Sequence, residues 1–322
     1  MSLIVEKFGG SSVRDRARLL RAMEIVKRTR EEGNDVVCVL SAQGGTTDEL
    51  LARARELADD PPARELDALL ATGETASVAL GAIALHSLGV PAVSLTGGQI
   101  PLKTDGTHGA AVVTAAGTER IRRELAAGNV VLAAGFQGVD EAGDTTTLGR
   151  GGSDTSAVAL AAFLGAERCV IYTDVDGVYT TDPRVCSTAR RLAEVSRSDM
   201  LRLAEHGAQV LHDRSVALAE RWDVPLEVRS CEAGSVGTRI VARAACGEVT
   251  GVTRRSAGET ARITAVGRGL PSLAALHAAV TAAERALATV LGIEEGEGRI
   301  TLTVRREDAD AALCAVHDAL VH

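Results

Sequence analysis

Residues Leu148–Ser156 combine an arginine, glycines, hydroxyls and one carboxylate in front of an apolar run. A glycine-rich turn that opens a helix presents backbone N–H groups and the positive end of the helix dipole to an anion. The planar guanidinium of Arg150 matches a carboxylate or a phosphate. Asp154 would repel phosphate unless a lysine or a metal ion lies between them. The structural alternative is that Ser153 or Asp154 only caps the next helix.

Two strand exits nearer the N-terminus are also rich in small and hydroxyl residues. Lys7 leaves a predicted strand and is followed by Gly9-Gly10-Ser11-Ser12, a pattern suited to the oxygens of a transferring phosphate. The next strand runs into a segment that contains Ser41 and Thr47. Polar groups that follow parallel strands gather at the carboxyl edge of an open α/β sheet, where such folds bind ligands. Lys7 could instead be a solvated lysine and Thr47 a helix cap, but the series favours a site.

Three later segments add candidate ligand-binding groups. Glu74 lies in Thr72–Thr75, a predicted turn within a helical region, where a carboxylate could hold an amino group. Gly135-Phe136-Gln137-Gly138 follows a predicted strand. Tyr172–Arg184 contains both tyrosines of the chain, three carboxylates and an arginine, a set suited to adenine, ribose and phosphates. The alternative for this last segment is a calcium loop, but the ligand order of an EF-hand is missing.

Missing motifs and overall composition exclude several classes of function. The chain has no GxxxxGK[ST] loop, no GxGxxG after its first strand and no G-x-S-x-G elbow, which argues against P-loop, dinucleotide and hydrolase chemistry. A net charge of −8 and 2% aromatic residues argue against a nucleic-acid partner. No apolar run approaches about twenty residues, so no membrane segment is expected. The six scattered cysteines predict buried free thiols in a cytoplasmic protein, without disulfides or a metal site.

Strands and helices alternate through the first two thirds of the chain, which predicts a mostly parallel sheet covered by helices. The predicted strands are Leu3–Phe8, Asp35–Ser41, Ala92–Leu95, Val130–Ala134, Arg168–Thr173 and Leu226–Arg229. The predicted helices are Val13–Arg30, Thr47–Ala58, Ala63–Leu88, Thr118–Ala126 and Asp199–Trp222. Beyond about residue 245 the order becomes strand, strand, helix, strand, strand, helix, which is typical of a small ferredoxin-like unit. We therefore expect domains at 1–245 and 246–322.

In order along residues 1 to 245, the motifs resemble those of the aspartokinases of the amino acid kinase superfamily. The segments that carry the resemblance are Lys7–Ser12, Ser41–Leu50, Gly73-Glu74, Gly135–Gly138, Thr146–Asp154 and Tyr172–Arg184. The resemblance implies an α/β/α sandwich with the amino acid kinase fold, followed by a ferredoxin-like ACT domain. It also implies transfer of the γ-phosphoryl group of ATP, with Mg²⁺ carried by the nucleotide, to the β-carboxylate of L-aspartate. The expected protein is a cytoplasmic homodimer joined through the ACT-like domain.

The resemblance also implies a role for each candidate residue. Lys7 would neutralise charge on the transferring group, and Asp154 would orient Lys7; these two are the implied catalytic residues. Arg150 would bind a carboxylate of the acceptor and Glu74 its ammonium. The implied acceptor pocket is completed by Ser41, Thr47, Phe136 and Ser153. The implied nucleotide-binding residues are Lys7, Gly9, Gly10, Ser11, Thr173, Asp174, Tyr179 and Arg184.

The chain departs from the family pattern at two places. Gln209 stands where a lysine is common in the later nucleotide-binding segment, so nucleotide binding should be weaker or altered in geometry. Only about 75 residues follow the expected domain boundary, enough for one ACT module rather than two. Its expected effector loop, Gly267–Ser272, lacks the acidic residue and the Pro-Gly pair that the resemblance would place there. Feedback by lysine or threonine is therefore expected to be weak or absent.

Two alternatives to an aspartokinase remain open from the sequence. The first is a kinase of the same fold that phosphorylates another amino acid or acid, since Arg150 and Glu74 recognise only an amino-acid head group. The second is a non-catalytic homologue that senses a ligand. Retention of both Lys7 and Asp154 argues against the second, because a sensor has no need to neutralise a transferring phosphate.

Overall fold

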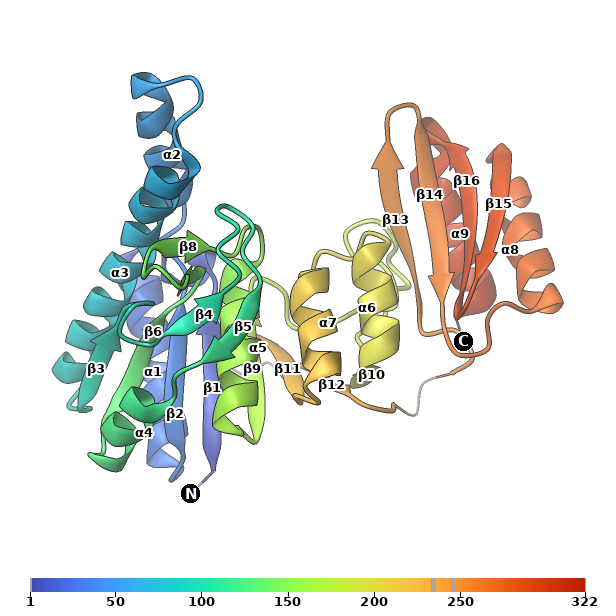
Figure 1. The fold of residues 1–322 in the computed structure, drawn as a ribbon. Coiled ribbons are helices and arrows are strands. Elements are labelled where there is room, and N and C mark those ends of the chain that lie inside the picture. The colour runs from blue at the N-terminus through green and yellow to red at the C-terminus, as the bar shows by residue number, and fades with distance from the viewer. Residues whose placement is uncertain (1, 233–235, 245–246, 322) are drawn as a thin grey trace. The chain divides into compact units, whose positions relative to one another are not determined.

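A computed structural model describes residues 2–232, 236–244 and 247–321, which form two compact units (Figure 1). The first unit comprises Met1–Asp176 and Arg221–Ser235. The second unit comprises Gly177–Glu220 and Val236–His322. The division at residue 245 expected from the sequence stays a prediction.

A parallel sheet forms the centre of the first unit. Its strands are β1 (Leu3–Phe8), β2 (Asp35–Leu40), β3 (Ala92–Leu95), β6 (Val130–Ala134), β9 (Arg168–Thr173) and β11 (Leu226–Ser230). They lie in the order β11-β9-β1-β2-β6-β3, and every neighbouring pair is parallel. These are the six strands that the sequence predicts, because runs of buried, β-branched residues bounded by turn formers suit a sheet covered on both faces.

Helices α1 (Arg16–Glu31), α3 (Ala63–Ser87), α4 (Glu119–Ala126) and α5 (Gly152–Leu164) cover the two faces of this sheet, whereas α2 (Thr46–Leu57) packs on α3. The side chains of α1 and α3 share one apolar cluster with Ile4 and Phe8 of β1. Because side chains alternate along a strand, Lys7 points to the opposite face, where α5 contacts β1. This alternation places the lysine against the start of α5.

Helix α3 runs without interruption through the segment where the sequence predicted a turn, so the predicted turn at Thr72–Thr75 is wrong. Gly73 lies within this helix, and the close packing explains why the residue is glycine: a Cβ there would lie 2.8 Å from Ala42 Cβ. A Cβ at Gly81 would lie 2.6 Å from Leu132 Cδ2 and 2.9 Å from Leu40 Cδ1. By length and hydropathy α3 would also suit a membrane span. It is nevertheless a core helix of the first unit, packed against the sheet.

A second, smaller sheet in the first unit was not predicted from the sequence. Its strands are β4 (Leu102–Thr104), β5 (Val113–Ala116), β7 (Gln137–Val139) and β8 (Thr145–Thr147), in the order β5-β4-β7-β8. The β7–β8 hairpin is antiparallel, and β8 ends directly before the glycine-rich turn at residues 148–151. The hairpin therefore delivers that turn to the start of α5.

The second unit contains an antiparallel sheet backed by two helices. Its elements are β13 (Gly251–Ala257), β14 (Thr260–Val266), α8 (Leu273–Arg285), β15 (Val290–Gly296), β16 (Arg299–Arg305) and α9 (Ala309–Leu320). The strand order is β13-β14-β16-β15, and both helices share an apolar cluster with the sheet. This is the ferredoxin-like order of elements that the sequence predicts.

The remainder of the second unit corrects one predicted helix. The stretch Asp199–Trp222 is broken into α6 (Arg197–Glu205) and α7 (Asp213–Arg221), separated by a segment around Gly207. A Cβ at Gly207 would lie 2.3 Å from the carbonyl oxygen of Arg254, so the chain needs glycine at this close approach. Two short parallel strands, β10 (Glu194–Ser196) and β12 (Thr238–Val241), complete the unit.

A disulfide in the second unit contradicts the expectation of free thiols. Cys186 and Cys314 are bonded across 128 residues of sequence. Cys38, Cys169 and Cys231 are free, and Cys246 lies outside the described residues. Spacing along the chain could not reveal the pair, because it depends on how distant segments meet.

Candidate active site

The carboxyl ends of four parallel strands lie side by side in the first unit. Phe8 of β1 is in register with Leu40 of β2 and with Tyr172 of β9, and Leu40 is in register with Ala134 of β6. The segments that follow these strands therefore start at one edge of the sheet. They are the segments that hold most of the candidate residues.

An ion pair between Lys7 and Asp154 lies at this edge. Lys7 Nζ is 2.5 Å from Asp154 Oδ1, and the two side chains are only 11% and 14% exposed. Asp154 belongs to the first turn of α5, and Gly151, with φ 68°, supplies the left-handed residue that starts this helix. The pair answers the difficulty raised by the carboxylate, because a lysine stands directly against it.

The exits of β1 and β2 are tied to each other through glycine. Gly44 donates a backbone hydrogen bond of 3.0 Å to the carbonyl oxygen of Gly10. A Cβ at Gly10 would lie 2.7 Å from the carbonyl oxygen of Ala42, so no larger residue fits without movement. A Cβ at Gly9 would lie 3.5 Å from Lys7 Nζ, and its absence leaves the ammonium approachable. Ser11 of this segment is exposed.

Glu74 of α3 projects a buried carboxylate toward the exit of β2. Its Oε1 accepts a 2.9 Å hydrogen bond from the backbone N–H of Ala42. Oε2 is buried and has no hydrogen-bond partner among the described residues. Burial raises the pKa of Glu74 to about 7, against the lowering effect of the Ala42 hydrogen bond. A buried carboxylate with one unsatisfied oxygen is suited to binding a cation.

Phe136 and Ser153 lie against the glycine-rich turn. Phe136 has φ 67°, rare for a residue with a side chain, and its N–H donates to Ser156 Oγ at 3.0 Å. A Cβ at Gly152 would lie 2.8 Å from Phe136 Cδ2. Ser153 is buried, and its Oγ would lie 2.9 Å from a Cβ at Gly135. The exit of β6 and the start of α5 are thus in direct contact.

The remaining acceptor candidates are more accessible. Arg150 is exposed, and it makes no hydrogen bond or ion pair to any residue that the structure describes. Ser41 and Thr47 are half-buried, and Thr47 is the second residue of α2, whose N-cap is Gly45. The cap role considered for Thr47 is therefore not observed.

The nucleotide-binding candidates fall in both units. Thr173 and Asp174 follow β9 in the first unit, where Thr173 Oγ1 donates to Asp174 Oδ1 at 3.0 Å. Tyr179 and Arg184 belong to the second unit. There the Arg184 guanidinium donates two hydrogen bonds to Asp182, of 3.0 and 2.9 Å, which lowers the pKa of that carboxyl.

One feature of this predicted binding segment is wrong. Tyr172 is not a loop residue but a buried residue of β9, with its ring stacked on Phe8 at a centroid distance of 4.6 Å. It belongs to the apolar cluster under α1, so it is not available to adenine. Of the two tyrosines, only Tyr179 is left for that role.

Sequence reasoning missed two buried carboxylates close to the site. Asp67 lies two turns before Glu74 on α3, and Glu6 precedes Lys7 on β1. Glu6 Oε1 accepts a 2.7 Å hydrogen bond from Thr29, and burial raises the pKa of Glu6 to about 7. The available signal was a carboxylate inside an apolar strand and another on the apolar face of a long helix.

Within residues 2–232, 236–244 and 247–321, no group of three or more His, Cys, Asp or Glu side chains is placed to hold a metal ion.

Residues 2–230 match a sequence family that is described as "Amino acid kinase family". The chain belongs to the amino acid kinase family. Within it, the chain groups with the aspartokinases: it is 53% identical to an aspartokinase of Geobacillus stearothermophilus over 240 residues, 74% of this chain and 59% of that one. It is 44% identical over 329 residues to an aspartokinase of Mycolicibacterium smegmatis, covering 97% and 77% of the two chains.

A solved structure extends the similarity to three dimensions. The chain matches E. coli aspartokinase III in complex with aspartate and ADP with a TM-score of 0.68 and 26% identity, covering 96% of this chain and 80% of that one. The match to the Geobacillus protein spans less than two thirds of that protein's length.

Proposed function

We propose that this chain transfers the γ-phosphoryl group of ATP to the β-carboxylate of L-aspartate and forms β-aspartyl phosphate. The observation that carries the proposal is the Lys7–Asp154 ion pair at the carboxyl edge of the sheet, against the N-terminus of α5. A lysine held there by a carboxylate is preorganised to neutralise charge that develops on a transferring phosphoryl group. The aspartokinase relatives and the aspartate and ADP bound to aspartokinase III support the choice of substrates.

The acceptor would be positioned by residues around the same edge. Glu74 would bind the ammonium group, since its buried Oε2 has no other described partner. The exposed Arg150 would bind a carboxylate, and Ser41, Thr47, Phe136 and Ser153 would complete the pocket. No general base is needed, because a carboxylate acceptor is already ionised near neutral pH. Catalysis would then consist of positioning and charge neutralisation.

The nucleotide would be bound through backbone groups of Gly9, Gly10 and Ser11 and by Lys7. Thr173, Asp174, Tyr179 and Arg184 are the proposed contacts to the rest of ATP. The metal ion is proposed to be carried by the nucleotide. Mg²⁺ bound in that way would supply further neutralisation between the phosphate oxygens.

A second candidate function is phosphorylation of another amino acid by the same machinery. Glu74 favours this class over simple acids, because leaving its buried carboxylate without a cation would cost binding energy. Nothing in Arg150 or Glu74 distinguishes aspartate from a longer amino acid. A non-catalytic sensor remains the other alternative.

The test is ATP-dependent hydroxamate formation with aspartate, glutamate, N-acylated amino acids and simple dicarboxylates. Aspartate should give the highest turnover, and Lys7→Ala and Asp154→Ala should each remove at least about a thousandfold of it. Lys27→Ala is the matched control, because Lys27 pairs with Glu31 on the surface of α1 and should leave turnover unchanged. Turnover of a different acid would support the second candidate, and turnover of none would support the sensor.

Feedback by lysine or threonine is proposed to be weak or absent. In the loop Gly267–Ser272 the backbone N–H of Gly269 donates to Glu248 O at 2.9 Å, and that of Gly267 donates to Gly298 O at 3.0 Å. These donors are used within the chain and are not free for an effector carboxylate. Activity measured across millimolar lysine and threonine tests this, and strong inhibition by either would contradict it.

We also propose a cytoplasmic homodimer that forms through the ACT-like sheet. The edge strand β15 exposes Leu291 and Ile293, and Leu287 just before it is 88% exposed. Apolar side chains at a sheet edge favour association with a second copy. Sedimentation of the wild type and of Leu291→Lys would test it, with the variant expected to shift toward the monomer.

A further inference from the structure

Both carboxylate oxygens of Asp67 accept hydrogen bonds from residues close to the glycine-rich turn. The side chain is buried, and its two oxygens accept from the backbone N–H of Thr147 at 3.0 Å and from Thr147 Oγ1 at 2.5 Å. They also accept from the backbone N–H of Gly109 at 3.0 Å and contact His108 Nδ1 at 2.8 Å. One carboxylate thus joins α3, the 105–112 loop and the last residue of β8.

Thr147 directly precedes the glycine-rich turn at residues 148–151, which carries Arg150 and leads into α5 with Ser153. Leu148 is buried and donates its N–H to Phe136 O at 2.8 Å, so the turn is held on both sides. We propose that Asp67 is a positioning residue that sets the place of Arg150 and Ser153 through Thr147. This inference rests on the proposed function for its kinetic readout but not for its structural one.

The test compares Asp67→Asn with Asp144→Asn. Asparagine keeps the shape of Asp67 but turns one acceptor into an NH₂ donor that faces other donors. Asp144 is the matched control, because it joins the same helix to the same hairpin through an ion pair with Arg64 at the surface. In Asp67→Asn the KM for the acceptor should rise about tenfold while the KM for ATP changes less than about twofold. Thr147→Val should give a smaller change in the same direction.

Amide hydrogen exchange gives a second readout that needs no activity. Asp67→Asn should speed exchange at residues 145–153 and 105–112, and Asp144→Asn should not. Equal increases in both KM values, or unchanged exchange at residues 145–153, would overturn the positioning role. If the wild type turned over no acid while the exchange difference persisted, the proposed function would fail and the positioning role would stand.

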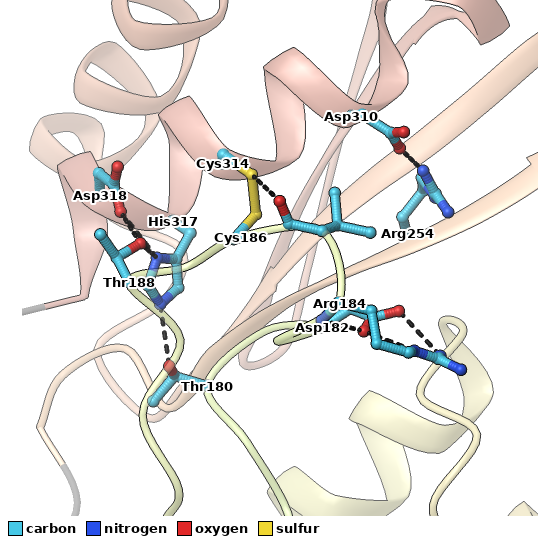
Figure 2. The surroundings of a disulfide bond; sticks show 11 residues. Thr180, Asp182, Arg184, Cys186, Thr188, Arg254, Asp310, Cys314, His317 and Asp318 are labelled. Atoms are coloured by element: carbon cyan, nitrogen blue, oxygen red, sulfur yellow. Dashed lines mark hydrogen bonds and ion pairs between the residues drawn. A yellow bond between two sulfur atoms is a disulfide. The ribbon is translucent and has the colours of Figure 1, made fainter.

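An independent observation concerns the disulfide of the second unit. Figure 2 shows the bond between α9 and the segment that carries Cys186. Cys186 is buried and Cys314 is half-exposed, so a small thiol would have to approach from the side of Cys314. The same face of α9 contacts the Cys186 segment twice more. His317 Nε2 lies 2.9 Å from Thr180 Oγ1, and Asp318 Oδ1 accepts from Thr188 Oγ1 at 2.5 Å.

The segment held in this way, residues 177–193, also contains Tyr179 and Arg184. Its start is fixed by Val178 N–H donating to Thr238 Oγ1 at 2.8 Å, and its middle by the disulfide. Without the disulfide, the contacts of His317 and Asp318 still join the segment to α9, but they are hydrogen bonds that water can replace. We infer that Cys186 and Cys314 are a reversible thiol–disulfide site that tightens this segment on α9 when oxidised.

The oxidant in this proposal is a small-molecule disulfide. The Cys314 thiolate attacks one of its sulfurs and releases a thiol, which leaves a mixed disulfide. The Cys186 thiolate then attacks Cys314 Sγ, forms the protein disulfide and releases the second thiol. The protein loses two protons and two electrons, and the small disulfide is reduced to two thiols.

The test uses the full chain treated with oxidised or reduced glutathione, followed by alkylation and peptide mapping. Oxidation of the folded chain should protect Cys186 and Cys314 from alkylation carried out after unfolding, and reduction of the folded chain should leave both open to it. The KM for ATP should differ about fivefold between the two states, with a matching difference in amide exchange at residues 177–193. In Cys186→Ser/Cys314→Ser the KM for ATP and the amide exchange should keep the values of the reduced wild type under both treatments. Cys231→Ser removes a half-buried free thiol and should respond like the wild type.

Each contrary result has a defined meaning. Failure of the bond to form, or resistance of the bond to native reduction, would overturn the reversible site. A bond that cycles without changing exchange at residues 177–193 would overturn the tightening of the segment. The mapping and exchange readouts do not depend on kinase activity, so they separate this proposal from the proposed function.

Discussion

The first and second units bury polar groups in different ways. In the first unit, the carboxylates of Glu6 and Glu74 each keep one buried oxygen without a described hydrogen-bond partner. In the ACT-like sheet of the second unit, the buried polar groups include neutral hydroxyls such as Thr264 and Thr301, which bond to each other at 3.0 Å. The unsatisfied oxygen of Glu74 lies where a ligand is expected to bind, whereas this pair of hydroxyls is satisfied within the chain.

The two units also differ in the kind of bond that holds a segment in place within each of them. The turn that carries Arg150 depends on hydrogen bonds to Asp67, whereas the Cys186 segment is covalently bonded to α9. Hydrogen bonds permit small adjustments around a substrate, and a disulfide restricts the unfolded chain. The adaptable contacts therefore lie around the turn of the first unit, and the covalent constraint lies in the second unit.

The sharpest challenge to the comparison is Glu74→Gln. If the buried carboxylate binds the substrate ammonium, the variant should lose about a thousandfold in kcat/KM for the amino acid. With a pKa of about 7 in the free protein, Glu74 should also make wild-type kcat/KM fall as the pH drops below that value, because the neutral acid cannot pair with a cation. Steady-state kinetics against pH measures both effects.

The control is Glu65→Gln, an exposed position on the same helix whose substitution should change neither quantity. If Glu74→Gln keeps the wild-type kcat/KM for the amino acid, and if that kcat/KM still falls at low pH, the unsatisfied oxygen of Glu74 is structural.

The disulfide gives the next largest expected effect. Under oxidising conditions Cys186→Ser/Cys314→Ser should destabilise the second unit by about 3 kcal/mol, a typical contribution of a native disulfide, because the variant loses the cross-link between positions 128 residues apart. Trp222, the only tryptophan of the chain, packs on Phe163 in the first unit and therefore reports on that unit. The variant should therefore lower the urea midpoint seen by circular dichroism more than that seen by tryptophan fluorescence. Equal shifts of both midpoints would remove the contrast between the units.

Glu6 allows the stability of the first unit to be tested against pH. Its pKa is raised from an ordinary value of 4.5 to about 7, so the folded state binds the proton more tightly than the unfolded state. The stability gained from that proton is complete below the unfolded pKa and is lost as the pH rises to about 7. The free energy of unfolding should fall by up to about 3 kcal/mol across this window, seen as a lower urea midpoint in Trp222 fluorescence.

Glu6→Gln should reduce this dependence without removing it, because glutamine does not titrate but Glu74, whose pKa is also raised to about 7, still does. The control Glu294→Gln removes an exposed partner of Arg262 in the second unit and should leave the curve unchanged. A wild-type midpoint that is constant between about pH 5 and about pH 7 would contradict the buried-charge description of the first unit.

The smallest expected effect concerns Gln209 in the second unit. This residue is exposed, so a substitution should not disturb packing. Gln209→Lys should lower the KM for ATP about threefold by adding a positive charge near phosphate, and added salt should weaken the gain. Steady-state kinetics at two salt concentrations checks it, and an unchanged KM would mean that this position does not face the nucleotide.

The sequence predicted the central sheet well because each of its strands is a short buried apolar run. The small sheet was missed since β7 and β8 are three residues long, and Thr145–Thr147 has no apolar alternation. The site was predicted as a set of strand exits, and the Lys7–Asp154 contact agrees with that reasoning. Asp67 and the Cys186–Cys314 pair were not predicted, because each depends on contacts between segments far apart in sequence.

Helix α3 has a consequence for how the chain can vary in length. Asp67, Glu74 and Gly81 follow one another at intervals of seven residues, so all three lie on one face, about 10 Å apart along the axis. One residue inserted between Asp67 and Gly81 would rotate part of that face by about 100°. Asp67, which contacts the β7–β8 hairpin, would then no longer lie on the same face as Gly81, which packs on the sheet. Insertions and deletions should therefore be tolerated at the ends of α3 and excluded from its middle.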